Sequence, residues 1–491
     1  MSRIVPFLLL SFLTLLLPAL QPTSYANGSI PQGLTGSSSI IYDYRIGLDR
    51  GCVASVTVLL RSENETAIAW ILIPKIGTDF VTNGSVVRID ADLQGRGTTS
   101  LYWNVSVLLT PGSHVVLGYS FPNACLVLRG RAVFLSPLLR FPSGARGSVS
   151  VKVQWPGASL TEVDATPSRV TRLADGFVVE RALPLTSDRL SFTFSVPKEE
   201  LVEVKYGPLT FVLPDRYRWV AERLSAFYAD FEGNLTELFP RSPERVRVTF
   251  FLPDRYDEGP EGYVSLDGDG REGSASLNLF LLRMVDGMLE VTFMHELVHR
   301  YLLANGVSAG ATWFHEGLAT YLSVRMAGAA GLEAAPYLRA MFDRYGVTAS
   351  DLKELMAWRP GESRGSRWYA MAYFAFERLF ETDRTGVVMA LRSLGRSQLA
   401  TPEDAAKHLF DHLNQEGKRF LIEGGLAIKG SDMLSQGIGT EIAVQSDRNS
   451  TYAGGGEIEN ATHLNHLLAN VLVITVVIVT LAIVLIDTRR A

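Results

Sequence analysis

The chain has 491 residues, of which 47% are hydrophobic and 20% are charged. This is an ordinary globular composition, and the length suffices for roughly two or three domains. The formal net charge is −5, and no run of five or more like charges occurs. Charge therefore excludes a basic nucleic-acid-binding surface and an acidic tail, and no nucleic-acid partner is expected.

The N-terminus has the pattern of a secretory signal. An apolar stretch over residues 4–20 follows Arg3 and runs into Ser24-Tyr25-Ala26, a small-x-small cleavage pattern. We therefore predict a signal peptide over residues 1–26. An uncleaved anchor helix is the alternative, because the apolar stretch is longer than is usual in a signal, and both alternatives export the bulk of the chain.

The C-terminus has the pattern of a membrane span. Residues 467–486 are 20 uncharged residues, about the length that crosses a hydrocarbon core of roughly 30 Å. A buried core helix is the alternative, but Arg489 and Arg490 follow at once, and basic flanks favour the cytoplasmic side. We predict a single-pass protein with a short cytoplasmic tail (487–491). Its polar, Gly/Ser-rich segment 429–466 is predicted to be a flexible stalk. The bulk of the chain is expected on the extracellular side.

Two further features bear on export. The only two cysteines, Cys52 and Cys125, either form one disulfide or remain two free buried thiols. N-x-S/T triplets, the acceptor pattern for N-glycosylation, agree with an extracellular glycoprotein. They lie at Asn27, Asn64, Asn83, Asn104, Asn234, Asn449 and Asn460.

Short alternating or β-branched runs fill residues 27–200, with Gly, Asn and Pro between them. This pattern is typical of a β-sandwich. The clearest runs are 55–60, 69–73, 148–154 and 190–195.

From residue 205 to 428 the pattern is that of an α+β domain. Strands alternate with a helix at first, and helices dominate from Asp286 onward. The expected elements are a strand at 209–213, a helix at 216–238, strands at 246–252 and 275–282, and a Gly/Asp-rich loop at 254–273.

A metal-binding motif lies on the helix expected at 286–304, which Asp286 is suited to cap and Asn305-Gly306 to end. His295 and His299 are four residues apart, so both imidazoles lie on one helix face and reach one ion. Glu296 points about 100° away from His295, close enough to act on a water molecule without being a ligand.

A third ligand is expected on the next helix. Glu316 follows His299 by seventeen residues, within Thr312-Trp-Phe-His-Glu-Gly-Leu-Ala. Two histidines, one carboxylate and an open position match the ligands of catalytic zinc. The alternative, a capping-box role for Glu316 after Thr312, fails because Glu316 is one residue too far along. His315 would point about 100° away, so we predict that it is not a ligand.

H-E-x-x-H and W-x-x-E-G-x-A on successive helices resemble the gluzincin zinc peptidases, particularly the peptidase MA-like families with thermolysin-like and aminopeptidase N-like enzymes. The resemblance covers about residues 205–428 and implies a thermolysin-like catalytic domain, one Zn²⁺ per chain and a tyrosine that stabilises the tetrahedral intermediate. Tyr369 fits that role, with Tyr373 one turn further as the competing candidate. The aminopeptidase pentapeptide G-x-M-E-N is absent. Glu261 or Glu272 could replace its glutamate, although surface solvation is favoured, and the edge of strand 275–282 could bind substrate backbone.

The predicted protein is thus a membrane-anchored extracellular zinc metallopeptidase acting on peptides or proteins, with Glu296 as general base. Two alternatives remain open: a catalytically silent surface-displayed binding or scaffold protein, and a zinc hydrolase of a non-peptide amide. His408 and His412 are also four apart, but no second motif accompanies them, and an amphipathic surface is expected there.

Overall fold

The structure is a computed structural model. It describes residues 40–426 except 64, 91–100, 140–144, 164–168, 184–188, 254–261, 265–271, 360–364 and 397. The chain divides into two units, residues 1–428 and 429–491, and every described residue belongs to the first. The predicted signal peptide, stalk, membrane span and tail all lie outside the described residues. None of the described helices has the length and apolar character that a membrane crossing requires.

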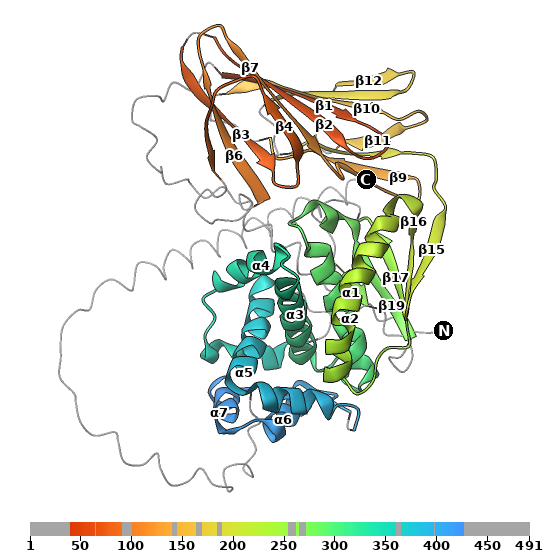
Figure 1. Ribbon diagram of the computed structural model, residues 1–491, viewed down its shortest axis with the longest axis vertical. Coiled ribbons are helices and arrows are strands. Elements are labelled where there is room, and N and C mark those ends of the chain that lie inside the picture. The colour runs from red at the N-terminus through yellow and green to blue at the C-terminus, as the bar shows by residue number, and fades with distance from the viewer. Residues whose placement is uncertain are drawn as a thin grey trace, which may run out of the picture. The chain divides into compact units, whose positions relative to one another are not determined.

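A seven-stranded sheet forms the larger part of the β-rich N-terminal region (Figure 1). Its order is β12-β13-β10-β1-β2-β7-β4, and its pairs are antiparallel except for the parallel pair β1 and β10. The strands are β1 (Ile40–Leu48), β2 (Ala54–Ser62), β4 (Thr78–Thr82), β7 (His114–Phe121), β10 (Arg146–Gln154), β12 (Arg169–Leu173) and β13 (Gly176–Leu183).

Two smaller sheets, β3-β6-β5 and β11-β14-β9-β8, share one apolar core with the seven-stranded sheet. Alternation builds this core: every second residue of β1 from Ile40 to Leu48 is buried, and the same holds for β2. The predicted strands in this region are confirmed. The smaller sheets contain β3 (Ala67–Pro74), β5 (Val86–Asp90), β6 (Tyr102–Leu109), β8 (Cys125–Leu128), β9 (Arg131–Leu135), β11 (Ser159–Val163) and β14 (Ser191–Ser195).

Both cysteines lie in this region as free, buried thiols. The carbonyl of Cys52 accepts a 2.8 Å hydrogen bond from the backbone N–H of Ala124, next to Cys125. Burial raises the pKa of the Cys125 thiol well above its ordinary value. Of the two alternatives that the sequence left open, the structure has the free thiols.

A separate five-stranded sheet has the order β15-β16-β17-β19-β18. The strand expected at 275–282 is wrong at both ends. It begins at Glu272, and it ends at Asn278 because the Asn278 side chain accepts from the N–H of Phe280 and starts a 3₁₀ turn. The strands are β15 (Leu201–Tyr206), β16 (Leu209–Pro214), β17 (Arg245–Phe251), β18 (Gly262–Val264) and β19 (Glu272–Asn278).

The position of β19 within this sheet also corrects an expectation. β19 pairs with β17 on one side and with β18 on the other. The backbone groups of both its edges therefore bond to other strands, and β19 cannot add a substrate strand. Within the described ranges β18 pairs with β19 alone, so β18 is the edge strand that could receive an extended peptide.

Helices form the rest of the unit, so the predicted mixed α+β fold with a β-rich N-terminal part is confirmed. Helices α1 and α2 pack on the five-stranded sheet, and α3 packs against α2 and α5 (Figure 1). The helices are α1 (Arg218–Leu238), α2 (Met288–Ala304), α3 (Thr312–Ala329), α4 (Ala334–Asp343), α5 (Ser366–Arg392), α6 (Pro402–His412) and α7 (Gln415–Glu423).

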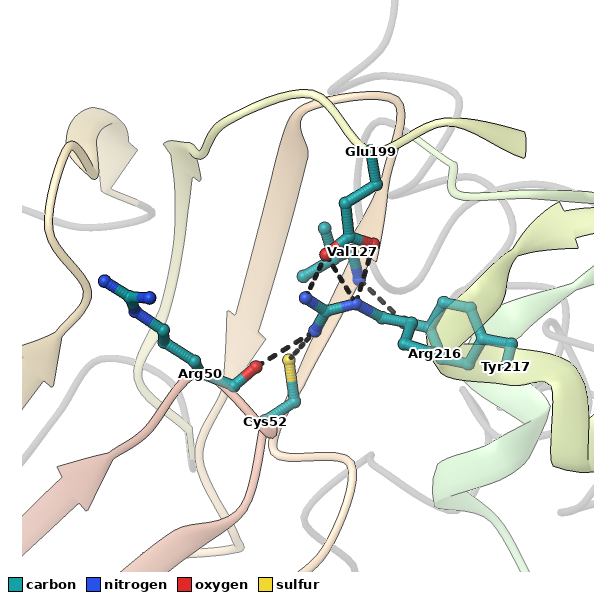
Figure 2. A network of polar contacts seen from close by, with 6 residues as sticks. All are labelled: Arg50, Cys52, Val127, Glu199, Arg216 and Tyr217. Carbon is teal, nitrogen blue, oxygen red and sulfur yellow. Dashed lines mark hydrogen bonds and ion pairs between the residues drawn. The ribbon is translucent and has the colours of Figure 1, made fainter. Parts of the chain in front are cut away.

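The residues just before α1 tie the helical part to the β-rich region (Figure 2). The Arg216 guanidinium forms an ion pair with Glu199 and donates to the Arg50 carbonyl at 3.1 Å and to the Cys52 sulfur at 3.4 Å. The neighbouring Tyr217 hydroxyl accepts a 2.8 Å hydrogen bond from the backbone N–H of Val127 in β8. These contacts fix the start of α1 on the edge of the β-rich region.

We expect Tyr217→Phe to lower the free energy of unfolding by about 1–3 kcal/mol, because the buried N–H of Val127 loses its acceptor while the ring still fills its place. Chemical denaturation of the full-length chain measures this. Tyr206→Phe, at a tyrosine that is 38% exposed, is the control and should change little. Equal stability of the two variants would contradict the role given to the Tyr217 hydroxyl.

Candidate metal centre

The helix that carries the H-E-x-x-H motif begins later than its sequence suggested. The expectation that Asp286 caps it is wrong: α2 begins at Met288, and the cap position is Gly287 with φ +87°. A Cβ at Gly287 would come within 2.6 Å of Leu332, so glycine suits this position for both space and backbone conformation. The Asp286 carboxylate instead forms a 2.7 Å ion pair with Arg223 of α1.

The structure brings the three predicted ligand residues together. Nε2 of His295 and Nε2 of His299 are 3.0 Å apart, and Oε2 of Glu316 is 3.3 Å from the first and 3.6 Å from the second. All three side chains are buried. The helical period sets the two imidazoles on one face of α2, and the packing of α3 against α2 adds the carboxylate.

These three atoms fit a zinc ion. Zinc binds imidazole nitrogen and carboxylate oxygen at roughly 2.0–2.2 Å in a tetrahedron, whose edges are then about 3.3–3.6 Å long. The observed triangle has edges of 3.0, 3.3 and 3.6 Å, which is close to one face of such a tetrahedron. Within the described ranges these residues form a group of histidine and carboxylate side chains able to hold a metal. Three ligands leave the fourth position open.

The charges of the site also favour a cation. Burial alone would raise the pKa of Glu316, but His299 and His295 outweigh it and hold that pKa below its ordinary value. Burial lowers the pKa of His295, with a partial offset from the hydrogen bond to Glu316. The group therefore has an ionised carboxylate beside a neutral imidazole with a lone pair to offer, as a metal ligand set requires.

Glu296 lies next to the edge strand β18. Its side chain is fully buried. A Cβ built on Gly262 would lie 2.8 Å from Oε1 of Glu296 and 3.0 Å from the methyl group of Thr292. The backbone of β18 thus passes directly over the Glu296 carboxylate, and only a residue without a side chain leaves room for it.

We expect Gly262→Ala to lower the rate of hydrolysis about 10-fold or more, because the new methyl group must displace either Glu296 or the edge strand at a cost of about 1–3 kcal/mol. Steady-state kinetics of the proposed hydrolysis measures this. Gly233→Ala in α1 is the matched control, since a Cβ there meets nothing within 4 Å. Equal rates for both variants would show that the approach of β18 to Glu296 does not matter.

His315 is not among the three grouped residues. That it is not a ligand stays a prediction. It is buried, and burial together with repulsion from His299 lowers its pKa to about 3. The sequence analysis did not identify Thr320 as a neighbour of this group. Its Oγ1 lies 3.5 Å from Nδ1 of His295. Thr320 follows Glu316 by four residues, so the same-face rule could have pointed to it.

The two tyrosine candidates have different surroundings. Tyr369 is 2% exposed, and its ring meets that of Trp358 edge to face. The Tyr373 hydroxyl donates to Glu377 at 2.9 Å, and burial raises its pKa. That bond engages the Tyr373 hydroxyl one turn along its own helix. The role of Tyr369 stays a prediction.

The other titratable residues considered from the sequence lie elsewhere. Nε2 of His408 and Nε2 of His412 lie 3.2 and 3.0 Å from Oγ of Ser393, where they fix the end of α5 against α6. Glu272 is exposed and forms an ion pair with Arg245, as expected for a solvated surface. Glu261 lies outside the described residues.

Solved structures that match this chain include an M1 zinc metallopeptidase, an aminopeptidase N family protein and an LTA4 hydrolase. An M1 zinc metallopeptidase from Deinococcus radiodurans, a mutant bound to a Tyr-Ser-Ala substrate, has 18% identity and a TM-score of 0.30, over 80% of this chain and 96% of its own. An aminopeptidase N family protein from Idiomarina loihiensis has 13% identity and a TM-score of 0.28, over 76% of this chain and 70% of its own. Yeast LTA4 hydrolase with bestatin has 11% identity and a TM-score of 0.30, over 81% of this chain and 69% of its own.

No family model and no curated protein matches the chain. Because the TM-scores of the structural matches are low, we base the function on the residues of the chain itself.

Proposed function

We propose that this protein is a zinc metallopeptidase that hydrolyses peptide bonds with water. One observation carries the proposal: Nε2 of His295, Nε2 of His299 and Oε2 of Glu316 converge to within 3.6 Å of one another in a buried site. The general base predicted from the motif, Glu296, follows the first ligand on the same helix. The domain around them is proposed to be a thermolysin-like catalytic domain with one zinc ion per chain.

Each side chain of the site has its own role in the proposed hydrolysis. When bound, zinc supplies Lewis-acid chemistry at the site. His295, His299 and Glu316 would hold the ion. Glu296 takes a proton from water onto a carboxylate oxygen as the water oxygen adds to the peptide carbonyl carbon. It then passes that proton to the leaving nitrogen as the C–N bond breaks, and the Tyr369 hydroxyl donates a hydrogen bond to the carbonyl oxygen.

The substrate class follows from the edge strand. Among the described strands β18 has one neighbour, so an extended peptide would pair with its other edge through backbone hydrogen bonds, near the Glu296 carboxylate against which Gly262 packs. Backbone pairing suits a peptide or protein substrate. This is the observation that favours peptide over non-peptide amides.

The site of action is proposed from the two ends of the chain. Apolar residues 4–20 and 467–486 support export followed by retention through one membrane span, with the catalytic unit on the extracellular side. Among the acceptors that the structure describes, Asn83 and Asn234 are exposed, whereas Asn104 is half-buried within β6. Protease treatment of intact cells that removes the catalytic unit would support this location, and full protection would oppose it.

The full-length chain tests the enzyme itself. We expect about one zinc ion per chain, as a single three-ligand site requires, and cleavage of peptides in a mixed library. Addition of a chelator should abolish cleavage, and zinc should restore it. Zinc without cleavage of any peptide would favour a binding protein or a non-peptide substrate, and a chain that binds no zinc would overturn the proposal.

A further inference from the structure

His315 lies between the metal centre and a backbone carbonyl in the loop that joins α2 to α3. Its Nδ1 is 3.2 Å from Nδ1 of His299, and its Nε2 is 3.0 Å from the carbonyl oxygen of Val307. All three residues are at most 2% exposed. The ring of His315 therefore connects one of the metal-facing imidazoles to the main chain inside the protein.

The hydrogen bonds from Val307 to His299 determine which ring nitrogens of His315 and His299 carry hydrogens. A carbonyl oxygen only accepts, so Nε2 of His315 carries a hydrogen and its Nδ1, in the neutral ring, is an acceptor. Nδ1 of His299 must then be the donor, because two acceptors would leave no hydrogen between the rings. A neutral His299 with its hydrogen on Nδ1 presents its lone pair at Nε2, the atom that faces His295 and Glu316.

The carbonyl at the far end of the connection is firmly held. The N–H of Val307 donates to the Leu302 carbonyl at 3.0 Å, and Val307 forms a parallel β-bridge with Leu399. The next N–H, that of Ser308, donates to the Leu399 carbonyl at 2.8 Å. A fixed acceptor orients the His315 ring, and the oriented ring in turn fixes that of His299.

We propose that His315 is a positioning residue, which sets the tautomer and ring orientation of His299 through a relay from the Val307 carbonyl. The proposal rests on the proposed function for the identity of the ion, but the relay itself is a property of the metal-free protein. Partners of this kind raise metal affinity, and their loss typically costs about 10–100-fold. The other imidazole has a different neighbour, the Thr320 hydroxyl.

Three substitutions separate the relay from simple packing. His315→Asn places an amide oxygen near the position of Nδ1 and so keeps the acceptor for His299. His315→Gln places an amide nitrogen near the position of Nε2, which keeps the bond to Val307 and removes the acceptor. His315→Leu removes both groups and retains an apolar filling of the space.

Zinc affinity of the full-length variants, measured by competition with a chelator, distinguishes the two roles. The relay predicts that His315→Asn stays within a few-fold of wild type and that His315→Gln and His315→Leu bind zinc about 10–100-fold more weakly. Packing alone predicts the opposite order, with Asn the most damaging because it fills the least space. Wild-type affinity in the Leu variant would overturn the proposal.

A measurement without zinc decides the relay independently. Nitrogen-15 NMR of the metal-free full-length chain, labelled at its eight histidines, reports which ring nitrogen carries the hydrogen. We expect the hydrogen of His299 on Nδ1 and that of His315 on Nε2, and a His299 hydrogen on Nε2 would overturn the relay. A chain with these tautomers that binds no zinc would instead refute the proposed function. Because the NMR measurement uses the wild-type chain, it does not depend on whether any His315 variant folds.

Discussion

Glu296→Gln is expected to retain zinc and to lose hydrolysis by about 10²–10⁴-fold, the contribution typical of a positioned general base. The amide has nearly the shape of the carboxylate, so the packing of Gly262 against residue 296 stays intact. It has no basic oxygen, however, and it takes no proton from water. Zinc content and kcat on a cleaved peptide, measured on the same preparation, test both halves of this expectation.

Glu290→Gln is the matched control for this variant. Glu290 is also a buried glutamate of α2, but its carboxylate pairs with Arg223 of α1 instead of facing the metal centre. We expect its kcat to stay near that of wild type. Normal hydrolysis in Glu296→Gln, or an equal loss in both variants, would remove Glu296 from the reaction.

Glu316→Gln is expected to lose both zinc and activity. The amide keeps the volume of the side chain within the packed α2–α3 interface but replaces the anionic ligand by a neutral one, leaving two imidazoles to hold the ion. The fall in zinc affinity should exceed the roughly 10–100-fold loss that follows removal of a partner outside the ligand set. Chelator competition measures the affinity.

The two substitutions are therefore expected to differ in zinc content, although both abolish hydrolysis. This difference tests whether Glu296 is the general base and Glu316 the zinc ligand. Glu296→Gln should be inactive with zinc bound, whereas Glu316→Gln should be inactive because zinc is absent. Activity in Glu316→Gln should rise as zinc is added in excess, and that of Glu296→Gln should not. Full zinc occupancy of Glu316→Gln at low zinc concentration would show that Glu316 is not a ligand.

Local sequence patterns are enough to define individual helices and strands of this protein and part of its candidate site. The period of the α-helix places His295 and His299 on one face wherever that helix lies in the fold, so the motif alone located two of the three grouped residues and the neighbouring Glu296. Alternation of buried and exposed residues likewise defines strands such as β2 and β10 without reference to their partners. These features depend on residues within a few positions of each other.

Only the tertiary structure decided which distant groups meet. The order of the five-stranded sheet makes β18 the edge and sets Gly262 against Glu296, and no local pattern encodes strand order. The Val307–Leu399 bridge holds the loop before α3 and thereby brings His315 against His299. Such contacts form between segments far apart in the chain, so they follow from the packing of the whole unit, whereas helix and strand periods follow from backbone geometry.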